Sequence, residues 1–272
     1  MELAQPFRIG LKPLDPADMF DLQGAAAALG EKRRLYAAMR DRCVMAEPAT
    51  LPAQEEARDL IAANLARYHG GASEDLSDPS PLGAAALTVP DDLVLMIEGH
   101  AGWRLGAASL CFPSSWSLPD KFGHPMRRIH GPVPLDEKME TRIERIFTGL
   151  HPERPVWRGN WALDRDMALR QERPEHHRND KHTLDAPSPV LRTEFQTLTK
   201  LPRSGAVLFT IRIGVVPLEE AVRDSRLAST LAAQYRAMQP AQRAYKGIET
   251  GGDRLLAMLD RHAAVTQEGT NG

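Results

Sequence analysis

With 42% hydrophobic residues among 272, the chain can bury a sizeable core, and its formal net charge of −2 offers no basic field to a nucleic-acid backbone. It contains two cysteines, Cys43 and Cys111, too few for a disulfide framework or for the thiolates that an iron–sulfur cluster normally takes. We therefore expect a globular protein with no nucleic-acid partner, which would have to receive any electrons that it used from elsewhere.

The N-terminal third of the chain predicts helices. Residues 1–16 lack the basic start and the uninterrupted apolar run of a secretory signal, and no later stretch is long enough to span a bilayer. We therefore expect a cytoplasmic protein with no membrane association. Apolar residues recur at helical spacing over 18–42 and again over 54–68, which predicts two packed helices. The stretch 69–81 is rich in Gly, Ser, Asp and Pro and predicts a loop.

Strand patterns dominate the middle of the chain, and helical patterns its end. Residues 93–97 and 103–112 are predicted to form an antiparallel hairpin, and residues 138–150 a helix. Two further strands are predicted at 156–163 and 205–213. Pro217 then opens a helical region that is interrupted at Pro240. Because helices and strands are segregated along the chain, the pattern predicts an α+β domain and not a βαβ fold. Neither GxGxxG nor GxxxxGK[ST] occurs, so no phosphate-binding loop is expected.

Histidine is the residue type here that could hold a metal. Pro132 and Pro134 restrict the backbone just beyond His130, so that this imidazole could be held in one direction, as an axial metal ligand must be. A histidine that caps a turn is the alternative. The three histidines between residues 176 and 182 lie among charged residues at spacings that match no zinc motif, and we interpret them as part of a solvated loop.

Two segments combine charged and amide groups with apolar neighbours: 158–161 (Arg-Gly-Asn-Trp) and 191–198 (Leu-Arg-Thr-Glu-Phe-Gln-Thr-Leu). Polar groups at the edge of a core must be paired, so these groups either form a buried network or line a ligand pocket. An ordinary ion pair, such as Arg192 or Arg212 with Glu194, explains them equally well. No GxSxG nucleophile elbow is present.

Several segments, in order, resemble those of the haem-dependent oxidative N-demethylase alpha-subunit-like family. They are 9–13, 92–96, 111–116, 129–134, 158–161, 191–198, 201–212 and 245–247. The resemblance implies a single domain over 1–272, with a PAS-like antiparallel sheet (about 90–216) wrapped by N-terminal helices (16–70) and C-terminal helices (217–264). It also implies haem b bound in the core, and reductase- and ferredoxin-type partner subunits that carry FMN and an iron–sulfur cluster.

The same resemblance implies oxidative N-demethylation of a small secondary amine such as dimethylamine, which uses O2 and releases formaldehyde. His130 becomes the expected iron ligand, with His124 and His100 as alternatives. The other residues expected to bind the cofactor are Arg158, Asn160, Trp161, Arg192 and Arg212. Of these, Arg158 and Arg192 are expected to pair with haem propionates or with a pocket network. The expected catalytic residues, Glu194 and Gln196, would orient the substrate or partner residues.

One position departs from the family pattern, and two other functions are open. Phe195 stands where the family has a basic residue, so a haem or electrostatic contact could be missing there, and Arg203 lies nearby in sequence. The first alternative is a non-catalytic PAS-like sensor that binds haem or another small ligand without turnover. The second is a structural subunit with no cofactor.

Overall fold

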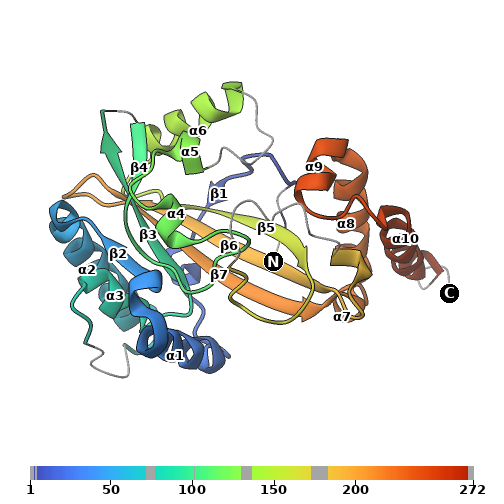
Figure 1. The fold of residues 1–272 in the computed structure, drawn as a ribbon, viewed down its shortest axis with the longest axis horizontal. Helices are drawn as coiled ribbons and strands as arrows, with labels where there is room; N and C mark the ends of the chain where they lie inside the picture. The colour runs from blue at the N-terminus through green and yellow to red at the C-terminus, as the bar shows by residue number, and fades with distance from the viewer. Residues whose placement is uncertain are drawn as a thin grey trace.

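The centre of the molecule is a seven-stranded sheet in the order β1-β5-β6-β7-β3-β4-β2 (Figure 1). The computed structural model describes residues 3, 5–71, 77–100, 102–129, 137–172 and 183–268. The strands are β1 (Lys12–Pro13), β2 (Val44–Ala46), β3 (Asp92–Gly99), β4 (Gly102–Ser109), β5 (Val156–Asp164), β6 (Val190–Lys200) and β7 (Val207–Pro217). Every neighbouring pair runs antiparallel. The predicted α+β class is therefore confirmed.

The helices lie before, between and after these strands. They are α1 (Ala26–Cys43), α2 (Leu51–Tyr68), α3 (Pro81–Ala86), α4 (Leu118–Lys121), α5 (Met126–Ile129), α6 (Glu137–Gly149), α7 (Leu218–Ala221), α8 (Ser225–Ala237), α9 (Pro240–Tyr245) and α10 (Gly252–Glu268). Short 3-10 turns occur at η1 (Pro16–Asp18), η2 (Pro48–Thr50) and η4 (Thr183–Asp185). Figure 1 shows α1–α3 gathered at one end of the molecule and α8–α10 at the other.

The first helix starts later than its apolar spacing predicts, at Ala26 instead of residue 18. The Asp21 side chain accepts a hydrogen bond from the backbone N–H of Gln23, and Gly24 has a φ of 74°, in the left-handed region that favours glycine. Local turn chemistry therefore overrides the apolar spacing before Ala26. The predicted strand 103–112 is also too long, since β4 ends at Ser109.

Side-chain alternation gives the sheet two distinct faces. On β3, Leu93 and Leu95 pack with α2 and α3 in one cluster, whereas Val94 and Met96 pack on the other side in a cluster that includes Phe147 of α6. A third cluster joins β5 and β6 to the C-terminal helices. We call the side of Val94 and Met96 the cavity face, because it borders the cavity described below, and the other side the helix face.

The central hairpin, β6–β7, extends over the full length of both strands, from Val190 opposite Pro217 to Lys200 opposite Val207. Its turn is anchored to α2, because Glu56 accepts hydrogen bonds from the backbone N–H groups of Arg203 and Ser204 at 2.7 and 2.8 Å. Arg203 is therefore part of this turn, and it does not line the cavity.

Candidate functional site

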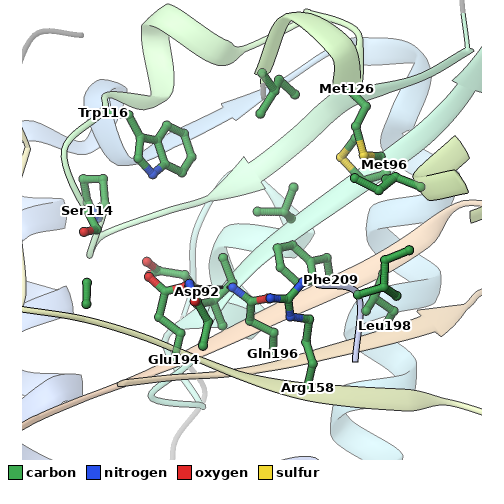
Figure 2. Close-up of a pocket in the computed structure, with 18 of the residues that line it drawn as sticks. Asp92, Met96, Ser114, Trp116, Met126, Arg158, Glu194, Gln196, Leu198 and Phe209 are labelled. Atoms are coloured by element: carbon green, nitrogen blue, oxygen red, sulfur yellow. Dashed lines mark hydrogen bonds between the residues drawn. The ribbon is translucent and has the colours of Figure 1, made fainter. Parts of the chain in front are cut away.

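A cavity of about 390 Å³ lies between the sheet and the segments that follow β4 (Figure 2). Strands β3, β5, β6 and β7 form its floor, and Trp116 and Met126 face that floor from the opposite side. Most of its lining is apolar, including Val94, Met96, Leu105, Leu110, Ile143, Ile146, Phe147, Leu198, Phe209 and Ile211. Mainly apolar walls with few polar groups are typical of a small-molecule site.

The register of the sheet explains which polar side chains reach this cavity. Arg158 lies opposite Gln196, Gln196 lies opposite Ile211, and Ile211 lies opposite Asp92. These directly paired residues project from the same face, as do residues two positions away on each strand. The floor therefore combines side chains from four strands that are far apart in sequence.

Glu194 is the centre of the polar group on the floor. One of its carboxylate oxygens, Oε2, accepts hydrogen bonds from Nδ2 of Asn160 at 3.1 Å and from Nε2 of Gln196 at 2.7 Å. All three side chains line the cavity. Two amide donors on one oxygen fix the orientation of the carboxylate, and the other oxygen, Oε1, lies 3.9 Å from Nε of Arg192. The structure thus brings together the two expected catalytic residues and one of the expected cofactor-binding residues.

Arg158 lines the same cavity without a hydrogen-bond partner at its buried Nε atom. Burial lowers the pKa of this guanidinium, and the nearby Glu194 carboxylate opposes that shift. A buried cation whose donors are unmet is costly, because water is lost and no hydrogen bond replaces it. The arrangement therefore favours an anionic group of a ligand at Arg158.

These features are accompanied by a match to a known protein family. Residues 10–256 match the family model described as haem-dependent oxidative N-demethylase, alpha subunit-like. The chain belongs to this family. The description gives haem dependence and N-demethylase chemistry as family attributes, and the words "alpha subunit" place the family within a multi-subunit assembly.

The cavity of this N-demethylase family member has the chemistry that haem requires. A haem presents a flat apolar ring that needs apolar walls, and propionate carboxylates that suit a guanidinium. The cavity supplies the walls through residues such as Met96, Phe209 and Ile211, and the guanidinium through Arg158. These apolar walls and the guanidinium therefore fit the macrocycle and a propionate of the cofactor that the family description names.

Arg192 has a different environment from Arg158, although both are expected cofactor-binding residues. The Arg192 side chain is fully buried and donates to the backbone carbonyls of Leu169 at 2.8 Å and Phe112 at 2.7 Å. Its Nε atom lies 3.9 Å from carboxylate oxygens of both Asp164 and Glu194. Arg192 does not line the cavity. It joins a cavity wall at Phe112 to the carboxylate on the floor.

Trp161 and Arg212, the remaining expected cofactor residues, lie on the helix face. The indole N–H of Trp161 donates to Gln234 at 2.5 Å, within the cluster formed by the C-terminal helices. The Arg212 guanidinium lies 3.9 Å from Asp91 and 4.6 Å from the ring centre of Phe195. Neither residue lines the cavity. Each lies next in sequence to residues that line the cavity, and because side chains alternate along a strand, its own side chain points to the opposite face.

The departure at Phe195 also falls on the helix face. The Phe195 ring stacks on Trp157, with centroids 5.0 Å apart, and Arg212 covers it. Phe195 does not line the cavity, whereas its neighbours Glu194 and Gln196 do. A basic side chain in the same direction would be separated from a ligand in the cavity by the sheet itself.

Asp92 is a lining residue that was not among the sequence candidates. Its carboxylate oxygens accept hydrogen bonds from the backbone N–H groups of Cys111 and Phe112, both at 2.8 Å. Burial raises the pKa of Asp92, while the Lys32 ammonium acts in the opposite direction. Asp92 therefore holds the backbone at the start of residues 112–116, which form one wall of the cavity. An acidic residue at the start of an apolar strand was the available sequence signal.

The structure describes some of the histidines that were considered as metal ligands. His130 and the three histidines between residues 176 and 182 lie outside the described residues. His100 and His124 are described, and neither lines the cavity. Within the described part of the chain, no group of three or more His, Cys, Asp or Glu residues could hold a metal ion. Among the same residues, no helix is long and apolar enough to cross a membrane.

Proposed function

We propose that this protein is a catalytic haem b subunit that removes a methyl group from a small secondary amine such as dimethylamine, with O2 as oxidant and formaldehyde as product. The observation that carries the proposal is the Arg158 guanidinium, whose buried Nε has no hydrogen-bond partner, near the Glu194 group in a largely apolar cavity, within a chain of this family. The PAS-like character of the sheet and a cytoplasmic location belong to the same proposal.

In this proposal, Arg158 pairs with a haem propionate and the apolar side chains hold the macrocycle. His130 would ligate the iron, and the last described residue before it, Ile129, lines the cavity. When bound, haem supplies the activation of O2 and the oxidation of the methyl group. Its electrons come from reductase- and ferredoxin-type partner subunits that carry FMN and an iron–sulfur cluster, since this chain has only two cysteines.

Glu194 is the proposed partner of the amine. A small secondary amine is protonated near neutral pH, and a carboxylate oxygen in a largely apolar cavity attracts that cation strongly. Asn160 and Gln196 hold Oε2, and Oε1, which lies 3.9 Å from Nε of Arg192, would accept the amine proton. Gln196 acts as a positioning residue through its hydrogen bond to Glu194.

The test is to express the protein with supplemented haem, record the visible spectrum and quantify haem per chain by pyridine haemochrome. Near-stoichiometric haem b is expected. Formaldehyde release from dimethylamine is then measured with an artificial electron donor. Haem binding without turnover of any small amine would favour the sensor alternative. A colourless protein after adequate haem supply would overturn the haem-binding proposal and favour a structural subunit.

A further inference from the structure

The two cysteines of the chain lie together in the fold. Cys43 ends α1 and Cys111 follows β4, and the backbone N–H of Leu110 donates to the carbonyl of Cys43 at 2.7 Å. Both cysteines have 0% exposure and share one apolar cluster. The antiparallel pairing of β2 with β4 produces this proximity. Both thiols are free, and Nη1 of Arg170 contacts both residues.

The surroundings of the pair are asymmetric. Nη1 of Arg170 lies 3.7 Å from the sulfur of Cys43 and donates to the backbone carbonyl of Cys111 at 2.9 Å. The hydrogen bond from the Cys111 thiol, together with the Arg170 charge, lowers the pKa of Cys43 against the effect of burial. The same hydrogen bond, together with burial, raises the pKa of Cys111. Cys43 is therefore the sulfur that ionises first and the better nucleophile.

We propose that Cys43 and Cys111 form a reversible intramolecular disulfide when the protein meets a peroxide, with Cys43 as the attacking sulfur. The proposal is independent of the function proposed above.

The chemistry needs only a peroxide as oxidant. The Cys43 thiolate attacks one oxygen of hydrogen peroxide, the O–O bond breaks, and the leaving hydroxide takes a proton to become water. Cys43 is now a sulfenic acid. The Cys111 sulfur attacks the Cys43 sulfur, the S–O bond breaks, and the Cys111 proton leaves with the hydroxide as a second water. Two thiols have been oxidised and one peroxide reduced; a dithiol reductant reverses the change.

The disulfide would act on the wall of the cavity. Cys111 stands between Leu110 and Phe112, which line the cavity, and its backbone N–H is held by Asp92. A covalent bond to Cys43 would tie this wall to the end of α1. Opening of the wall would then require movement of the helix as well, so the amides of Cys111 and Phe112 should exchange with solvent more slowly in the oxidised protein.

The experiment treats the reduced, folded, full-length protein with hydrogen peroxide, unfolds it in an alkylating reagent and measures its intact mass. The expected product has lost both alkylation sites together and is monomeric on a non-reducing gel, and dithiothreitol restores both sites. Because the chain has only two cysteines, no mapping is needed. Two sites that stay alkylatable, or a disulfide-linked dimer, would overturn the proposal.

Single variants test the order of the steps. Cys111→Ser should accumulate a sulfenic acid at Cys43 that dimedone captures, whereas Cys43→Ser should give little adduct. Equal labelling of the two variants, or stronger labelling of Cys43→Ser, would refute Cys43 as the attacking sulfur. Circular dichroism checks that each variant is folded.

Substitutions that leave both cysteines in place remove any dependence on those variants. Arg170→Met should slow disulfide formation severalfold, because the rate follows the thiolate fraction of the attacking sulfur. Arg42→Met is the matched control: Arg42 also pairs with Glu172, at 2.6 Å, and this exposed side chain makes no contact of the Arg170 kind with a cysteine. Equal rates for the two variants would contradict the role of Arg170 in activating Cys43.

Discussion

Polar side chains on the two faces of the central sheet have different surroundings. On the cavity face, the Glu194 group is bonded within itself and Arg158 has a buried donor with no partner. On the helix face, the indole of Trp161 is bonded to Gln234, and Arg212 covers the ring of Phe195. The buried charge on the cavity face borders a space that a ligand can enter, whereas the charged groups on the helix face, including the buried Asp91 carboxylate near Arg212, lie within side-chain packing. Strands β5, β6 and β7 contribute to both faces, so adjacent residues on one strand have different roles.

The largest expected effect tests the role of the cavity face in catalysis. Glu194→Gln retains size but loses the carboxylate, so kcat/KM for amine demethylation should fall by roughly 10²- to 10⁴-fold, as for loss of a general base. Haem content should be unchanged. Thr193→Val, one residue earlier and on the other face, is the control and should retain activity. A Glu194→Gln protein with normal turnover would remove the carboxylate from the mechanism.

Arg192 should dominate stability. Arg192→Met leaves the carbonyls of Leu169 and Phe112 without their donor and two carboxylates without a buried cation, which should lower the free energy of unfolding by about 3–5 kcal/mol. The exposed Arg203, whose side chain is 68% accessible, is the control, and Arg203→Met should cost below about 1 kcal/mol. Denaturant titration measures both. Similar losses would mean that Arg192 carries no special structural role.

Asp91 on the helix face should make stability depend on pH. Burial raises the pKa of this carboxyl from 3.8 to about 7, although Arg212 and Lys32 oppose the shift. The folded state then holds a proton that the unfolded state releases, so stability should fall as pH rises from about 4 to 7, by at most about 1.4 kcal/mol for each pH unit. Asp91→Asn should flatten this profile in denaturant titrations. A profile as steep as that of the wild type would assign the dependence to other groups.

Arg158 should control cofactor affinity. Arg158→Met removes the charge that we assign to a propionate, so the haem dissociation constant should rise by roughly 10- to 100-fold, the equivalent of about 1.5–3 kcal/mol for a charged hydrogen bond. Arg212→Met, on the helix face, should leave haem affinity unchanged. Spectroscopic haem titration of both apoproteins measures the difference. Equal changes in the haem dissociation constant for the two variants would show that haem affinity does not depend on which face carries the arginine.

The sequence predicts the fold class and the segments that hold the site, but not the division of each segment between faces. Asn160 and Trp161 were candidates together, yet adjacent residues on a strand point to opposite sides, and strand periodicity could have separated them. Strand β6 was not predicted as a strand, because its alternate positions face a partly polar cavity and break the apolar pattern. The bond from Arg192 to the Phe112 carbonyl joins residues far apart in sequence, and no local pattern encodes it.

The smallest expected effect concerns Phe195, where the family resemblance leads us to expect a basic residue. Phe195→Lys should leave haem affinity and turnover unchanged, because the side chain points to the helix face. It should lower the free energy of unfolding by about 1 kcal/mol, since the stack on Trp157 is lost and a second cation is brought to Arg212. Phe195→Leu, which adds no charge, separates the lost stack from the repulsion. If Phe195→Lys strengthened haem binding, the position would act on the cavity through the sheet, and the two faces would be coupled.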